Sequence, residues 1–195
     1  MRKPVKSLVL ITISAFLFHS ATAQLKLPAI QGVGNDVKKV IEDYPNQFNN
    51  LMGDVIMENT QSIDYRCNFT INGAEEAFLT RYSAKKEVCS WQALMLTTES
   101  FDKAKQKFKS LFNQLNNLSI HIGSANYRLK GKYEAPEESK KFNSVLFVFD
   151  PVNEAGKKLK VEISMQYEAP MDWKVKLLIY DKEREDDERG KINEE

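Results

Sequence analysis

Hydrophobic residues recur at two different spacings along this chain, and the change from one to the other predicts the order of its elements. Asn35 and Asp36 are residue types that favour a helix N-cap, and helical spacing follows them. Pro45 interrupts that pattern, so we expect a helix that kinks or restarts there. The apolar positions at helical spacing are Val37, Val40, Ile41, Tyr44, Phe48, Leu51, Met52, Val55 and Ile56.

From Ile63 the period changes to two, which is typical of a strand with one buried face. Its apolar positions are Ile63, Tyr65, Cys67, Phe69 and Ile71. Asn72-Gly73 is a hairpin-type turn, and Ala77 to Tyr82 is the expected return strand. A third strand is predicted over Val88 to Leu96, with Cys89 and Trp91 on the same face. The two cysteines are therefore expected on neighbouring strands.

A second amphipathic helix is predicted by a longer apolar stripe. Its positions are Phe101, Ala104, Phe108, Leu111, Phe112, Leu115 and Leu118. Thr98 or Ser100 can cap its start, and Asp102 suits the positive end of the helix dipole. Lysines 103, 105, 107 and 109 fall outside the stripe, as expected of a solvated helix face.

Strand patterns then return over the rest of the chain. We expect strands over Ile120 to Tyr133, with a break at Gly123, and then over Phe142 to Phe149, Leu159 to Tyr167 and Trp173 to Tyr180. The last three read as an antiparallel meander. The predicted fold is α+β: about seven antiparallel strands packed on one face by two amphipathic helices, in the order α-βββ-α-ββββ.

The first residues have the three zones of a secretory signal peptide. Arg2, Lys3 and Lys6 precede the apolar run Leu8–Phe18, and Ala21-Thr22-Ala23 is a cleavage pattern. We therefore expect residues 1–23 to be a cleavable signal, residues 24–180 one α+β domain and residues 181–195 a charged, disordered tail.

This signal predicts an exported protein, either periplasmic or extracellular. The run Leu8–Phe18 is shorter than the about 20 apolar residues that a membrane-spanning helix needs. Gln24 follows the cleavage pattern and no cysteine is near it, which speaks against a lipid anchor. We expect no stable membrane span.

Charge and cysteine content narrow the class of protein. The chain has 28 basic and 27 acidic residues, so it lacks the basic excess typical of nucleic-acid binding. Cys67 and Cys89 are an even pair, and in an oxidising compartment they predict a disulfide. The alternative is two buried, reduced thiols that behave as small apolar residues.

Several short motifs suggest chemistry but lack the rest of the pattern. His121 is the one histidine after the predicted signal, and two cysteines with one distant histidine are a poor zinc set. Cys89-Ser90-Trp91 lies in a predicted strand rather than at a helix start, unlike a papain-type nucleophile. Gly32-Val33-Gly34 has no preceding strand and no third glycine. No catalytic residue is assigned, and no metal or cofactor is expected.

One group of basic residues is a candidate patch for an anionic ligand. It consists of Arg128, Lys130, Lys132, Lys157, Lys158 and Lys160, with Lys140 and Lys141 nearby in sequence. Antiparallel strands could bring these residues to one edge of the sheet. The alternative is that lysines there protect sheet edges against aggregation.

The expected function is therefore binding or interaction rather than catalysis. The ligand would be a small apolar molecule, a peptide or an envelope component, and not nucleic acid. One alternative is an exported hydrolase whose acids come from separate strands, marked by two carboxyls across a deep cleft. Another is a subunit of an envelope assembly, for which a contiguous exposed apolar patch would be the sign.

Overall fold

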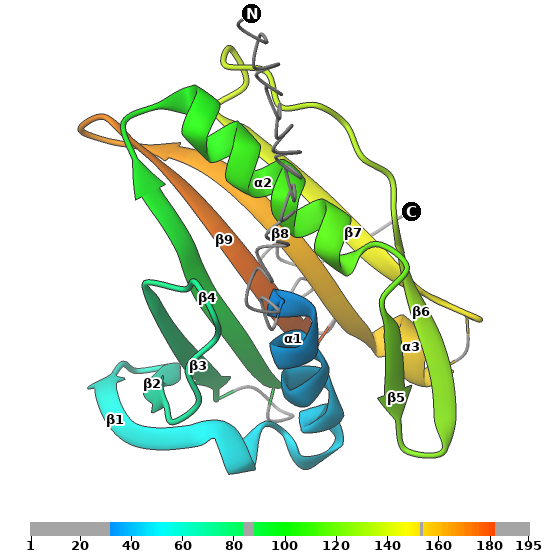
Figure 1. Cartoon of the computed structure of the whole chain (residues 1–195). Coiled ribbons are helices and arrows are strands. Elements are labelled where there is room, and N and C mark those ends of the chain that lie inside the picture. The colour runs from blue at the N-terminus through cyan, green and yellow to red at the C-terminus, as the bar shows by residue number, and fades with distance from the viewer. Residues whose placement is uncertain (1–31, 84–87, 153, 182–195) are drawn as a thin grey trace, which may run out of the picture. The chain divides into compact units, whose positions relative to one another are not determined.

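The computed structural model in Figure 1 describes residues 32–83, 88–152 and 154–181, all of which belong to the unit Gln31–Glu195. The predicted signal peptide, residues 1–23, lies outside the described residues. So does the predicted tail apart from Asp181, which is the last residue of a strand.

A single antiparallel sheet of nine strands dominates the described part of the chain, in the order β1-β2-β3-β4-β9-β8-β7-β6-β5. The strands are β1 Met52–Glu58, β2 Ser62–Cys67, β3 Glu76–Tyr82, β4 Val88–Thr98, β5 Ser119–Ile122, β6 Ala125–Gly131, β7 Phe142–Asp150, β8 Leu159–Glu168 and β9 Asp172–Asp181. The α+β class is confirmed, and the expected meander is β7-β8-β9. The expected number of about seven strands is wrong.

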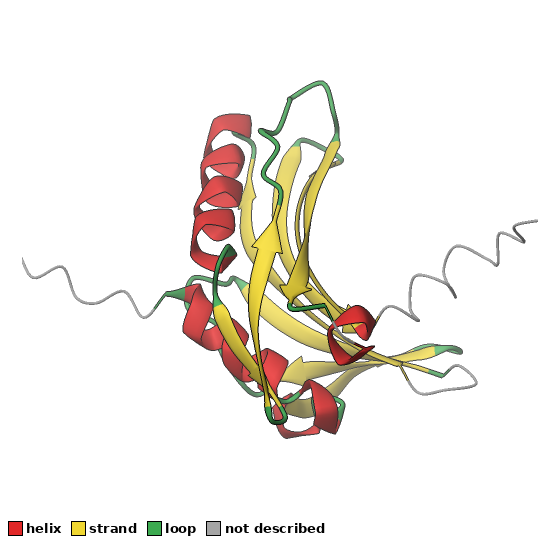
Figure 2. Ribbon diagram, turned by 90° about the vertical axis from the view of Figure 1, so that its right-hand side faces the viewer, coloured by secondary structure: helices red, strands yellow, loops and turns green. Residues whose placement is uncertain are grey.

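Helices are few and mostly short in the part of the chain that the structure describes. They are α1 Val33–Glu42, α2 Phe101–Leu115, α3 Glu154–Lys158 and the 3-10 turns η1 Tyr44–Asn46 and η2 Asn49–Leu51. Helix α3 lies in the connection between the predicted strands Phe142 to Phe149 and Leu159 to Tyr167. Figure 2, turned from the first view, shows these helices beside the strands of the sheet.

One of the two unexpected strands is β1, where helical spacing had suggested a continued helix. Gln47 and Phe48 have positive φ angles of 55° and 57°, a left-handed conformation that stops a right-handed helix. Phe48 and Leu51 are buried in the core, whereas Val55 pairs with Tyr65 in the β1–β2 ladder. The apolar spacing there matched a helix by coincidence.

The other unexpected strand comes from the segment Ile120 to Tyr133, which divides at Gly123. Gly123 has φ +60°, and β5 and β6 pair antiparallel on either side of it. The predicted break is therefore a full hairpin turn. The strand predicted from Ile63 to Ile71 is shorter than expected, because β2 ends at Cys67.

Helix α2 matches its prediction most closely. The Ser100 side chain accepts a hydrogen bond from the backbone N–H of Lys103 at 3.3 Å and caps the helix. The helix contacts β4, β8 and β9, and Figure 1 shows it running across these strands. Phe101 meets Trp173 edge-on with ring centroids 5.2 Å apart, and Phe112 stacks on Phe147 at 5.8 Å.

These contacts distinguish the two faces of the sheet. We call the face that bears Phe147 and Trp173 the inner face, since α2 packs on it. Directly paired residues of neighbouring strands share a face, and side chains alternate along each strand. The opposite side, which we call the outer face, therefore carries the residues that alternate with Phe147, including Leu146 and Val148 of β7.

The inner face is packed tightly where β6 meets β7. A Cβ added to Gly131 would lie 2.8 Å from Cε1 of Phe147 and 3.0 Å from Cγ1 of Val145. Both neighbours are buried, so neither ring nor methyl can move aside freely. Gly131 is needed here for close approach to the Phe147 ring.

Replacing Gly131 by alanine should lower the free energy of unfolding by about 1–3 kcal/mol, because the added methyl overpacks the core. Urea denaturation measures this change. In a Phe147→Leu background the same substitution should cost less, since the obstructing ring atoms are gone. An equal cost in both backgrounds would show that Phe147 is not the obstacle.

Ion pairs hold the β8–β9 hairpin at its turn. The Glu168 carboxylate accepts from Lys174 Nζ at 2.6 Å and from Lys176 Nζ at 2.9 Å. These hydrogen bonds lower the pKa of Glu168 below its ordinary value. Because the folded-state pKa is depressed, the stabilisation is present above the unfolded pKa and is lost as pH falls through the folded pKa.

Glu168→Gln should therefore be less stable than the wild type near neutral pH, by about 1 kcal/mol or less. The difference should shrink as the pH falls below the ordinary value of 4.5 and vanish once the wild-type carboxylate is protonated. Urea denaturation from about pH 7 to about pH 3 tests this. Glu134→Gln is the control, since the Glu134–Lys132 pair is exposed. If the difference in unfolding free energy between the wild type and Glu168→Gln is the same at every pH, the lowered pKa of Glu168 does not stabilise the fold.

Candidate binding surface

The two cysteines do not form the predicted disulfide. Cys67 ends β2 and Cys89 lies in β4, so β3 separates them in the sheet. Cys89 pairs with Arg81, which in turn pairs with Ile63, four positions from Cys67 along β2. Neighbouring strands are about 4.8 Å apart, so this offset exceeds the reach of a disulfide. The prediction failed because it placed the cysteines on adjacent strands.

The outer face of β7 carries large apolar side chains exposed to solvent. Phe142 is 55% exposed, Leu146 41% and Val148 48%. They lie at alternate positions, with Ser144 between the first two, and we call these three residues the apolar stripe. At about 3.3 Å per residue the stripe is about 20 Å long. Val145, Phe147 and Phe149 point to the opposite face and are buried.

Cations flank the apolar stripe on both neighbouring strands. Lys130 of β6 pairs with Val148, so the two side chains share the outer face. On the other side Leu146 pairs with Glu162 of β8, and Lys160 is two positions before Glu162 on the same face. Glu162 accepts a hydrogen bond from the Tyr180 hydroxyl at 2.9 Å. Lys160 makes no hydrogen bond or ion pair to any described residue.

The predicted basic group is thus only partly gathered. Arg128 and Lys130 lie at alternate positions of β6 and face outward, and Lys160 lies on the same face two strands away. Lys132 follows β6 and forms an ion pair with the Glu134 carboxylate at 3.1 Å. Lys130 also donates to the Asn117 side chain. Lys157 and Lys158 are exposed at the end of α3, immediately before β8.

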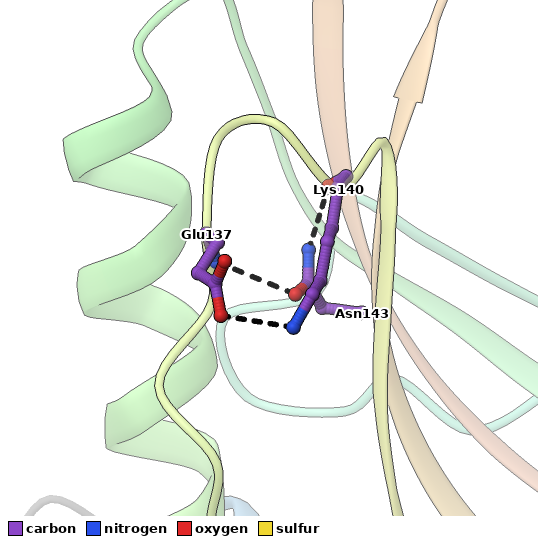
Figure 3. Close-up of polar contacts among 3 residues, drawn as sticks. All are labelled: Glu137, Lys140 and Asn143. Carbon is purple, nitrogen blue, oxygen red and sulfur yellow. Dashed lines mark hydrogen bonds and ion pairs between the residues drawn. The ribbon is translucent and has the colours of Figure 1, made fainter.

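The two other lysines lie near the opposite end of β7. Lys140 donates to Glu137 Oε1 at 2.9 Å, and Asn143 donates to the Lys140 carbonyl at 2.9 Å (Figure 3). Within this exposed pair, hydrogen bonding lowers the pKa of Glu137 and raises that of Lys140. Lys141 lies over the Tyr167 ring, 4.4 Å from its centroid. These two lysines are therefore engaged locally and stand apart from Arg128, Lys130 and Lys160.

A surface cavity of about 430 Å³ lies beyond the Val148 end of the apolar stripe. Its lining residues are Ser119, Asn126, Tyr127, Arg128, Asp150 and Pro151. Ser119 pairs with Arg128, and Arg128 pairs with Asp150, so these three polar side chains form a row across β5, β6 and β7. Asp150 is two positions after Val148, so the row continues the outer face that bears the stripe.

Acidic side chains are few among the described residues at this cavity. Asp150 is the one carboxyl among the described residues that line the cavity, whereas the hydrolase alternative needs two facing each other. His121 is exposed on β5, and Cys89-Ser90-Trp91 is buried in β4 as the strand pattern predicted. No group of three or more His, Cys, Asp or Glu is placed to hold a metal ion within residues 32–83, 88–152 and 154–181.

The apolar stripe was missed in the sequence, although a signal for it exists. The run Val145-Leu146-Phe147-Val148-Phe149 is continuously apolar, a pattern typical of a strand with apolar residues on both faces. Periodicity alone does not say whether a second face is covered.

Among the described residues, no helix is long and apolar enough to cross a membrane.

Comparison with known proteins found no match to this chain among family models, curated proteins or solved structures.

Proposed function

We propose that the protein is a non-catalytic binding module that contacts an anionic lipid surface through the outer face of β6–β8. The observation that carries the proposal is the apolar stripe, exposed between strands that bear Lys130 and Lys160. Export to an envelope or extracellular compartment, inferred from residues 1–23, would bring the domain to such surfaces.

The apolar side chains account for one half of the interaction. Exposed apolar patches rimmed by polar residues mark protein or membrane contact sites. Phe142, Leu146 and Val148 belong to one strand and face one way, so a single flat surface can cover all three. Burial of such side chains at the boundary between headgroups and acyl chains is favourable in proportion to the apolar area covered.

The cations account for the other half and favour a negatively charged surface. Each lysine or arginine near an anionic bilayer contributes about 1 kcal/mol. Arg128 and Lys160 form no ion pair with any described residue, so their charges are available to a partner. Glu162 is on the same face, and the hydrogen bond that it accepts from the Tyr180 hydroxyl leaves its negative charge in place. The cations Arg128, Lys130 and Lys160 still outnumber the carboxylates of Glu162 and Asp150 beside the apolar stripe.

We also infer that α1 and α2 cover the inner face, which supports use of the outer face for binding. The contact of α1 with β5 and that of α2 with β4, β8 and β9 support this arrangement.

An envelope-assembly subunit is the second candidate, favoured by a separate exposed group on the edge strand β1. Its residues Val55, Ile56 and Met57 are 49%, 52% and 55% exposed.

The test is co-sedimentation of the mature domain, residues 24–195, with vesicles of phosphatidylcholine alone or mixed equally with phosphatidylglycerol. We expect binding to the mixed vesicles, and weakening by added salt because screening reduces the cationic contribution. Lys130→Gln/Lys160→Gln should weaken binding about tenfold or more. Leu146→Ser/Val148→Ser should also weaken binding to the mixed vesicles, but the effect of added salt on binding should stay the same as for the wild type.

Matched controls separate this face from general charge or hydrophobicity. Lys103→Gln/Lys109→Gln on α2 removes the same charge elsewhere, and Val55→Ser/Met57→Ser removes apolar side chains from β1. Both should bind like the wild type, with circular dichroism and thermal unfolding confirming that each variant is folded. Equal wild-type binding to both kinds of vesicle, or equal losses in the control variants, would refute the proposal.

A further inference from the structure

The cavity beyond the apolar stripe presents three polar side chains in one row. Ser119, Arg128 and Asp150 occupy directly paired positions on β5, β6 and β7, so their side chains project from the same face. Paired positions on neighbouring antiparallel strands have Cβ atoms about 5 Å apart. The row therefore offers a hydroxyl donor, a cation and an anion in succession.

Neither charged group of this row forms an ion pair with a described residue. Arg128 is exposed, and its side chain makes no hydrogen bond or ion pair to any described residue. Asp150 is likewise exposed, and no described side chain forms an ion pair with its carboxylate. Although they are paired in the ladder, the two groups are not bonded to each other, which leaves both available to one ligand.

The charge pattern selects the kind of ligand. A guanidinium binds a phosphate through paired N–H donors, and the Ser119 hydroxyl can donate to the same group. A lone phosphate dianion would be repelled by the Asp150 carboxylate. A ligand that carries a phosphate and, a few ångströms away, an ammonium group satisfies both charges at once.

We propose that this cavity binds the phosphoethanolamine headgroup of a lipid, with the phosphate on Arg128 and Ser119 and the ammonium on Asp150. The inference rests on the proposed function, because the acyl region of the same surface would contact the apolar stripe. Asp150 and Val148 are two positions apart on one face of β7, so headgroup and stripe contacts are continuous. Asn126 and Pro151 form further parts of the wall.

A phosphocholine headgroup is the matched comparison. It carries the same phosphate and the same positive charge, but its nitrogen has three methyl groups and no N–H to donate to Asp150. The site should therefore prefer ethanolamine over choline, since a hydrogen bond between charged groups is lost with choline and the carboxylate stays unpaired.

The experiment compares vesicles of phosphatidylglycerol mixed equally with phosphatidylethanolamine or with phosphatidylcholine. The wild-type domain should bind the ethanolamine vesicles about tenfold more tightly. Asp150→Asn should reduce this preference to near unity, and Arg128→Gln should weaken binding to the ethanolamine vesicles more than to the choline vesicles. Soluble glycerophosphoethanolamine, but not glycerophosphocholine, should shift the amide NMR signals of residues 119, 126, 128 and 150.

The outcomes distinguish this inference from the proposed function. Lys130→Gln/Lys160→Gln should lower binding to both mixtures and keep their ratio. If the wild type binds both mixtures equally, or if Asp150→Asn keeps the preference, the headgroup assignment is wrong while the anionic-surface proposal stands. If no vesicle binds but the soluble headgroup does, the cavity assignment stands and the lipid surface is wrong. Absence of both kinds of binding overturns both.

Discussion

The antiparallel pairing of β4 with β9 is the contact on which the described structure depends. It joins the meander β1–β4 to the meander β5–β9, through a ladder from Ser90–Tyr180 to Thr98–Trp173. These partners are far apart in sequence, so the chain loses much entropy before they meet. Burial of Trp91, Ala93, Leu177 and Ile179 at this junction offsets that loss.

The ladder also contains its main irregularity, and a side chain stabilises it. The register shifts between Leu94 and Leu96, where one extra residue is accommodated. Glu75 accepts from both the N–H and the hydroxyl of Thr97, each at 2.8 Å, just beyond the shift. The register shift lies shortly before the turn into α2. The Glu75–Thr97 contact, made by the β2–β3 connection, therefore helps to position α2 on the inner face.

A wide sheet has two faces, and here they differ in what they carry. On the inner face the side chains of β7 are buried, whereas on the outer face Phe142, Leu146 and Val148 of β7 are exposed to solvent. Strands β6 and β8 place cations beside these side chains, and the end of β7 places Asp150 opposite Arg128. The candidate surface is therefore a consequence of strand order, since its residues come from four strands.

The sequence by itself determined the local elements with strong periodicity. It predicted α2 with its Ser100 cap, the buried face of β4 and the β7-β8-β9 meander, because side-chain spacing and capping act within a few residues. It did not determine β1, because apolar residues from Phe48 to Ile56 satisfy a helical period and only pairing with β2 decides between helix and strand. Beyond that meander, only the tertiary structure decided which strands are neighbours. That order separates Cys67 from Cys89 by β3 and aligns Ser119, Arg128 and Asp150, since hydrogen bonding across a sheet joins residues whose distance in sequence carries no periodic signal.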